Sequence, residues 1–66
     1  MADEYPTTVA GLAELFLGNI LYALESTAMA LEGSGKPEDA AFYRGIAREL
    51  AEAHGRATRR AGDGER

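Results

Sequence analysis

The sequence predicts an all-α protein: an antiparallel hairpin of two helices that pairs with a second copy into a dimeric four-helix bundle. Apolar residues recur every three or four positions in two long stretches, and a Gly-Ser-Gly-Lys-Pro segment separates the stretches. A chain of 66 residues is also short for burying a core alone. The predicted organisation is an extended lead-in over residues 1–8, a hairpin over residues 9–61 and a flexible tail over residues 62–66.

The first helix is expected over residues 9–32. Pro6 disfavours helical backbone at Tyr5, and either Thr7 or Thr8 can cap the helix N-terminus. One face of this helix collects Val9, Ala13, Phe16, Leu17, Ile20, Leu24 and Leu31, with Ala23 and Ala28 at its edges. Glu14, Glu25 and Glu32 cluster just beyond this face.

A loop over residues 33–36 is expected to end this helix and start the second. Gly33 and Gly35 suit the left-handed backbone of a helix C-cap. Pro37 fits the first position of a helix, and Glu38 and Asp39 then complement the helix dipole. The second helix is expected over residues 37–61. Its apolar stripe is Phe42, Tyr43, Ile46, Leu50, Ala53 and Ala57.

Two apolar surfaces are predicted on the hairpin. The main interface between helices and between copies comprises Phe16, Leu17, Ile20, Leu24, Leu31, Tyr43, Ile46 and Leu50. Leu15, Tyr22 and Met29 recur every seven positions on the other side of the first helix. This second stripe is interpreted either as further core of the oligomer, the commoner use of such spacing, or as a surface for another protein.

Charge is distributed unevenly along the chain. Residues 1–35 carry five acidic side chains and no basic one, whereas residues 36–66 carry seven basic and six acidic ones. An acidic half repels nucleic acid and anionic membranes, so neither is an expected partner. It attracts a basic segment, which the second half supplies. The apolar stretch over residues 9–31 contains Glu14, Asn19 and Glu25, which favours a helix in water over a membrane span.

The side-chain inventory argues against catalysis and metal chemistry within one chain. There is no cysteine, and His54 is the single histidine, so thiolate chemistry and multi-histidine sites are excluded. We therefore expect no enzyme activity, no cofactor and no metal in a single chain. A site shared by two His54 residues across a dimer axis stays open as an alternative to a structural histidine. A cysteine-free chain with an acidic N-terminus also suits the cytoplasm.

Gly11 and Gly18 lie on one stripe of the first predicted helix. Glycine within a helix costs about 1 kcal/mol relative to alanine. The pair indicates either a close approach of another backbone or a surface that tolerates glycine. Residues 17–22 resemble the first-helix signature of the tetratricopeptide repeat, and residues 35–40 are similar to the turn into its second helix. The separation of Gly18 and Ala40 exceeds the family spacing, so no function is transferred from this resemblance.

These observations predict a non-catalytic interaction or assembly module that associates with itself and with another protein. Two alternatives remain open. The chain can be an obligate accessory subunit of a larger complex, in which a different chain covers the second stripe. It can also be a bundle that binds a ligand or metal through His54.

Overall fold

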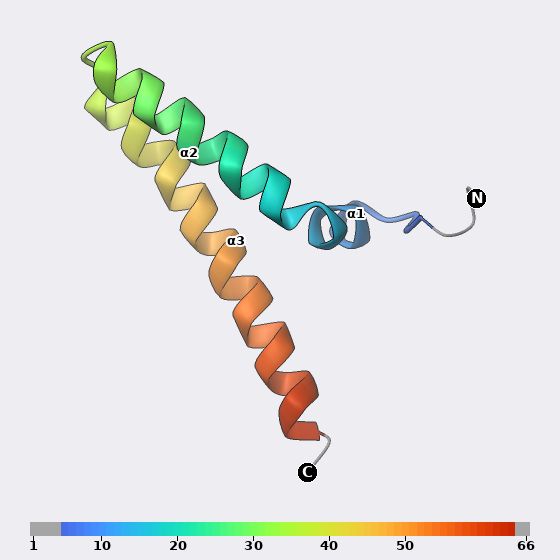
Figure 1. Ribbon diagram of the computed structural model, residues 1–66. Coiled ribbons are helices and arrows are strands. Elements are labelled where there is room, and N and C mark those ends of the chain that lie inside the picture. Colours follow the sequence, from blue (N-terminus) through green and yellow to red (C-terminus); the bar gives the residue numbers. More distant parts are fainter. Residues whose placement is uncertain (1–4, 65–66) are drawn as a thin grey trace.

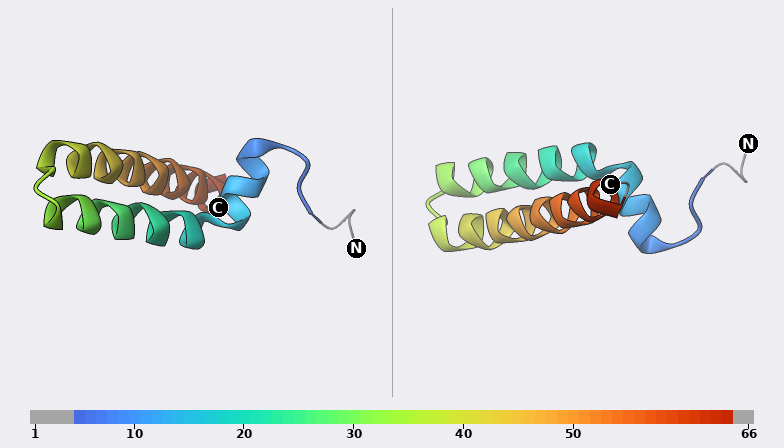
Figure 2. Two further views of the ribbon diagram at one scale, coloured as in Figure 1. Left: turned by 90° about the horizontal axis from the view of Figure 1, so that it is seen from above. Right: turned by 90° about the horizontal axis from the view of Figure 1, so that it is seen from below.

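The computed structural model describes the backbone of residues 5–64 and the side chains of residues 5–57. Over residues 5–64 it contains three helices and no strand: α1 (Val9–Leu15), α2 (Leu17–Gly33) and α3 (Pro37–Gly64). The predicted all-helical class is confirmed. α2 and α3 lie side by side from the loop that joins them (Figures 1 and 2), and their axes separate toward the other end, where α1 lies.

Thr8 caps α1. Its backbone is extended (φ −112°, ψ 155°), and its side-chain Oγ1 accepts a hydrogen bond of 3.0 Å from the Gly11 backbone N–H. This bond satisfies one of the N–H groups that have no partner at a helix N-terminus. Thr8 was one of the two predicted caps. Residues 5–8 precede α1 without helical structure, and residues 1–4 of the predicted lead-in lie outside the described residues.

The prediction of one continuous helix over residues 9–32 is wrong. The helix breaks at Phe16, whose φ of −105° and ψ of 24° depart from helical values, and α1 and α2 meet there at an angle of 79°. No proline, which would indicate a helix break in the sequence, lies at this position. The bend places Ala10 and Ala13 near the second half of α3, a region from which α2 diverges. The bend also brings Glu14 of α1 to 3.5 Å from His54 of α3, and this approach of α1 to α3 is the physical reason that we assign to the break.

The chain leaves α2 through two hydrogen bonds typical of a Schellman motif. The Lys36 N–H donates to the Leu31 carbonyl at 2.8 Å, and the Gly35 N–H donates to the Glu32 carbonyl at 3.1 Å. Gly35 has a φ of 78°, which a residue with a Cβ rarely adopts. α2 includes Gly33, one residue beyond the expected end, and α3 begins at Pro37, as expected.

α3 extends further than the sequence predicted. It continues to Gly64, whereas the expected end was residue 61 and a flexible tail was expected over residues 62–66. Glycine lowers helix propensity but still donates the backbone hydrogen bond, so Gly62 and Gly64 do not stop the helix as proline would. Residues 65–66 of the predicted tail lie outside the described residues.

The helices form a single layer. The smallest extent of the molecule is 14 Å, little more than one helix diameter, and the radius of gyration is 15.0 Å. A compact chain of this length would have a radius of gyration of about 11 Å. Among the described side chains, only Ala28 and Ala40 are fully buried and apolar. The larger apolar side chains therefore keep part of their surface in contact with solvent.

Candidate interaction surface

The closest contact between α2 and α3 lies near the loop. Ala28 of α2 and Ala40 of α3 have no solvent exposure. Small side chains allow two helix backbones to approach closely, and here they define the line along which the helices touch. Ala28 was expected only at the edge of the apolar face, and Ala40 was not singled out.

One side of this contact line is closed by charged groups. The Arg44 guanidinium of α3 donates two hydrogen bonds to the Glu25 carboxylate, at 3.2 and 3.1 Å, and one to Glu32. The hydrogen bond from Arg44, aided by its positive charge, lowers the pKa of Glu32. The bonds to Glu25 and then to Glu32 raise the pKa of Arg44. The general attraction between the acidic and basic halves was predicted, but Arg44 was not identified as the residue that bridges both glutamates.

The other side of the contact line is apolar and open. Turning α2 through the helical repeat places Glu25 and Glu32 on one side of Ala28, and Ile20 and Leu31 on the other. The same helical repeat along α3 places Arg44 on one side of Ala40 and the apolar residues Tyr43 and Leu50 on the other. We call the apolar side the open face. It comprises Phe16, Leu17, Ile20, Leu24, Leu31, Phe42, Tyr43, Ile46 and Leu50.

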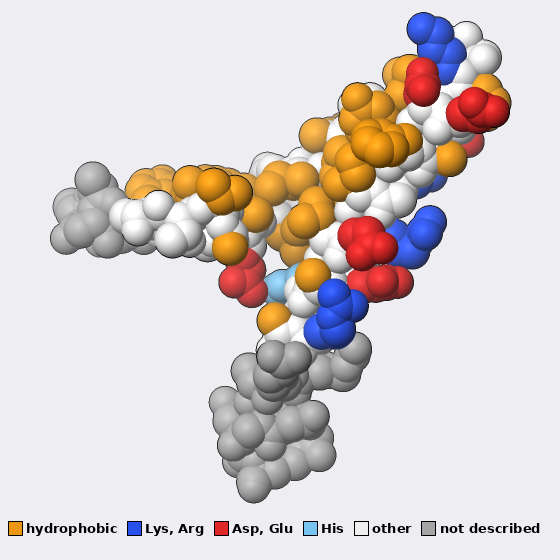
Figure 3. All heavy atoms as spheres, turned by 180° about the vertical axis from the view of Figure 1, so that it is seen from behind, with side chains coloured by type: hydrophobic (Ala, Val, Ile, Leu, Met, Phe, Trp, Pro, Cys, Tyr) orange, Lys and Arg blue, Asp and Glu red, His pale blue; other side chains and the backbone are white. Residues whose placement is uncertain are grey.

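The open face contains every residue of the predicted main interface. Seven of the eight predicted residues are partly buried, and Phe16 is 43% exposed. The ninth member, Phe42, was recognised on the apolar stripe of the second helix but was not included in the predicted interface. Figure 3 shows apolar side chains extending along α1 and α2 to the part of the molecule near the loop. The predicted residues thus lie together in the structure, but none of them is fully buried by this chain.

At the loop end of the open face, Phe42 stands out from a shallow hollow. Thr27 and Leu31 of α2 line this hollow with Asp39, Phe42 and Tyr43 of α3. The Phe42 ring is 66% exposed and packs against the Tyr43 ring in an edge-to-face arrangement, with centroids 5.7 Å apart and planes at 82°. A large apolar side chain with this exposure, held on one edge by another aromatic ring, is available for contact with another molecule.

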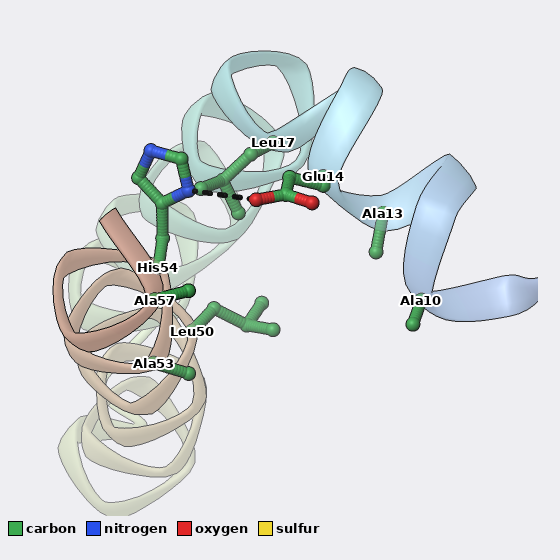
Figure 4. A pocket seen from close by; sticks show the side chains of 8 residues that line it. All are labelled: Ala10, Ala13, Glu14, Leu17, Leu50, Ala53, His54 and Ala57. Carbon is green, nitrogen blue, oxygen red and sulfur yellow. Dashed lines mark ion pairs between the residues drawn. The ribbon is translucent and has the colours of Figure 1, made fainter. Parts of the chain in front are cut away.

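At the opposite end, the three helices surround an open cavity of about 290 Å³, which we call the slot. Its walls carry mostly small or apolar side chains, drawn in Figure 4: Ala10, Ala13, Glu14, Leu17, Leu50, Ala53, His54 and Ala57. Glu14 of α1 points toward His54 of α3, with Glu14 Oε2 3.5 Å from His54 Nδ1. The slot could not be predicted from the sequence, because it depends on the bend at Phe16.

The second predicted stripe is divided by the same bend. Leu15 belongs to α1, whereas Tyr22 and Met29 belong to α2, so the three do not form one stripe on a single straight helix. All three are exposed, at 53%, 76% and 60% respectively. Tyr22 and Met29 lie on α2 beyond Glu25, away from the open face.

Gly11 and Gly18 also fall on different helices. A Cβ added to Gly11 would lie 2.7 Å from the Cβ of Pro6, so this glycine allows the chain's own lead-in to pack closely on α1. A Cβ added to Gly18 would meet no atom within 4 Å. Within this chain, close backbone approach therefore accounts for Gly11 and not for Gly18.

The described part of the chain contains no group of three or more histidine, aspartate or glutamate side chains placed to hold a metal ion. In the same part, no single helix is long and apolar enough to cross a membrane. α1 and α2 reach that length and composition only when taken together, and they are bent by 79°. Comparisons with protein-family models, with curated proteins and with solved structures found no match.

Proposed function

We propose that this chain is a non-catalytic protein–protein interaction module that self-associates through its open face. In this proposal α2 and α3 act as an antiparallel hairpin, and two hairpins pair to form a four-helix bundle. The observation that carries the proposal is the single layer of helices, with the larger apolar side chains gathered on one side of it. Stable domains bury such a side against a second layer.

Energetic considerations support a second copy as that layer. Ordering the chain costs conformational entropy, which burial of apolar surface must offset. The two fully buried alanines, Ala28 and Ala40, contribute little apolar area to offset this cost. Pairing two open faces would bury Leu24, Ile46 and their neighbours in both copies at once. A twofold dimer uses the same surface twice, so one apolar face is sufficient.

The test is the mass of the purified chain in solution, measured by light scattering after size exclusion over a dilution series. We expect a compact assembly of two or four chains. Leu24→Asp places a charge in the middle of the open face and should convert the assembly into unfolded or monomeric chains. Ser26→Asp is the matched control, because Ser26 is exposed on another side of the same helix. A Leu24→Asp variant that keeps its mass and helicity would refute the proposal.

The exposed pair Tyr22 and Met29 favours a second candidate function, that of an accessory subunit in a larger complex. Their side chains are 76% and 60% exposed on α2, away from the open face, and exposed apolar surface of this kind marks contact sites. If a different chain is required for folding, the isolated chain will be weakly helical and monomeric, or will aggregate without a defined mass. A well-folded dimer would argue against this candidate.

A ligand- or metal-binding bundle is the remaining alternative, because the slot places His54 beside Glu14. Such a bundle would show unfolding that shifts with added Zn²⁺ and stops shifting in His54→Ala. Unfolding that is the same with and without Zn²⁺ would remove the metal-binding form of this alternative.

A further inference from the structure

The open face carries a protrusion and a cavity at opposite ends. Phe42 protrudes at the loop end, and the slot lies at the other end, with Ala53 and Ala57 in its wall. Eleven positions of α3 separate Phe42 from Ala53, which corresponds to ~17 Å along the helix axis. Both features belong to the same apolar side of α3, so a surface that presents one also presents the other.

The slot has the size and lining that suit an aromatic ring. Its volume is about 290 Å³, whereas an apolar protein cavity of about 150 Å³ is large enough to bind benzene. Alanine and leucine side chains supply most of its walls, and the slot is open toward solvent. Glu14 and His54 are the two polar side chains that line it. A phenylalanine ring that enters the slot therefore contacts mostly alanine and leucine side chains.

We propose that two copies pack with their loops at opposite ends, so that Phe42 of each copy fills the slot of the other. This inference rests on the self-association proposed above and specifies its geometry. A twofold axis that crosses the open face perpendicular to α3, level with position 48 along the helix, would bring each Phe42 to the other copy's slot. The contact is then made twice per dimer, as a twofold interface requires. The two slots are completed only by the second copy.

The charges on α3 favour this orientation over the reverse one. Glu38 and Asp39 lie in the first turn of α3, whereas Arg56 lies near the slot end. Packing two α3 helices in opposite directions places the acidic end of each beside the basic end of the other. It also opposes the two helix dipoles. With both loops at the same end, the acidic turns would face each other and both slots would stay empty.

The orientation also determines the relation between the two His54 side chains. With the axis level with position 48, the two His54 positions lie ~18 Å apart along the helix direction. A metal ion shared by both histidines needs them within a few ångströms of each other, because Zn–N distances are about 2.0–2.1 Å. The proposed dimer therefore excludes a His54–His54 metal site, whereas a dimer with its axis near His54 would permit one.

The first measurement reports the orientation without disturbing the open face. The chain has no cysteine, so Ser34→Cys in the loop provides a single attachment point for a spin label. In the proposed dimer the two labels lie at opposite ends, and pulsed electron resonance should give a separation of roughly 35–40 Å. A dimer with a separation below about 20 Å would refute the inference and leave self-association intact. Absence of any dimer would refute the proposed self-association and the inference together.

The second measurement tests the contact itself. Phe42→Ala should raise the dimer dissociation constant by at least about tenfold, as expected when an aromatic anchor leaves its cavity. Tyr22→Ala is the matched control, because Tyr22 is also an exposed aromatic residue but lies away from the open face; its effect should stay within about threefold. Ala53→Phe fills the slot from its own wall and should weaken the dimer as Phe42→Ala does. If Phe42→Ala and Tyr22→Ala have equal effects, Phe42 does not occupy the slot.

Discussion

The two ends of the α2–α3 pair differ in how the helices are held. Near the loop, fully buried Ala28 and Ala40 bring the backbones together, and Arg44 links α3 to Glu25 and Glu32. At the other end none of the described side chains is fully buried, and Glu14 of α1 lies 3.5 Å from His54 of α3. The helices are in close contact near the loop, which we call the closed end, and they are separated at the other end.

This difference shows how small residues determine what a helical pair leaves for a partner. Ala28 and Ala40 have small side chains, so their burial uses little of the chain's apolar surface while it brings the two helices close together. The leucines, isoleucine and aromatic residues beside them are left on the open face, and the divergence of the helices creates the slot. A chain with large residues at positions 28 and 40 would hold its helices further apart and would present a different face.

The largest effect is expected from enlarging a fully buried alanine. Ala40→Leu adds three carbon atoms where the side chain has no exposed surface, and such overpacking typically costs about 1–3 kcal/mol. Ala41→Leu is the matched control, since Ala41 is the exposed neighbour on the same helix. Urea unfolding followed by circular dichroism, at one fixed protein concentration, measures both. Equal midpoints for the two variants would show that the closed end is not packed as described.

A smaller effect is expected from the loop that joins the helices. Gly35→Ala forces a residue with a Cβ into left-handed backbone (φ 78°), at a cost of about 1–2 kcal/mol. Gly33→Ala is its control, because Gly33 lies in α2 and a Cβ there would meet no atom within 4 Å. That variant should be as stable as the original chain or gain up to about 1 kcal/mol from helix propensity. Equal losses in both variants would contradict the Schellman geometry.

Local sequence signals predicted the start of α1 and the loop between α2 and α3. The loop glycines, Pro37 and the Thr8 cap each act through the backbone of a few neighbouring residues, so their consequences can be read from sequence. Periodicity also identified the apolar residues that form most of the open face. The break at Phe16 could not be predicted in this way, because no residue at that position requires it. We assign it to the approach of α1 to α3 at Glu14 and His54, which are far apart in the sequence.

The charged side of the helix pair was predicted only in general terms. The unequal charges of the two halves indicated mutual attraction, and Glu14, Glu25 and Glu32 were seen to cluster beside the apolar face. Which base meets which acid depends on how α3 is rotated against α2. That rotation follows from the burial of Ala28 and Ala40, so Arg44 could be identified only after the helix packing was known. The slot follows from the same packing and from the bend at Phe16.

The smallest effect is expected from removing the ion pairs of Arg44. It is measured as a change in how stability depends on pH. Because Arg44 lowers the pKa of Glu32 in the folded chain, folding is favoured more when Glu32 is ionised. This contribution is present above the ordinary glutamate range, near pH 4.5, and is lost as the pH falls through the lowered pKa. Unfolding midpoints at pH 7 and pH 3 should therefore differ less in Arg44→Met than in the original chain.

Arg48→Met is the control that distinguishes loss of the Arg44 ion pairs from loss of a positive charge elsewhere on α3. Arg48 is exposed one turn further along α3, and it takes no part in the ion pairs among the described side chains. Its variant should keep the original difference between pH 7 and pH 3. Because the Arg44 pairs are partly exposed to solvent, added salt should reduce their contribution in the original chain and have little effect in Arg44→Met. If both variants lose the same pH dependence, the closed end is held by its alanines, and Arg44 only shields that side of α2 and α3 from a partner.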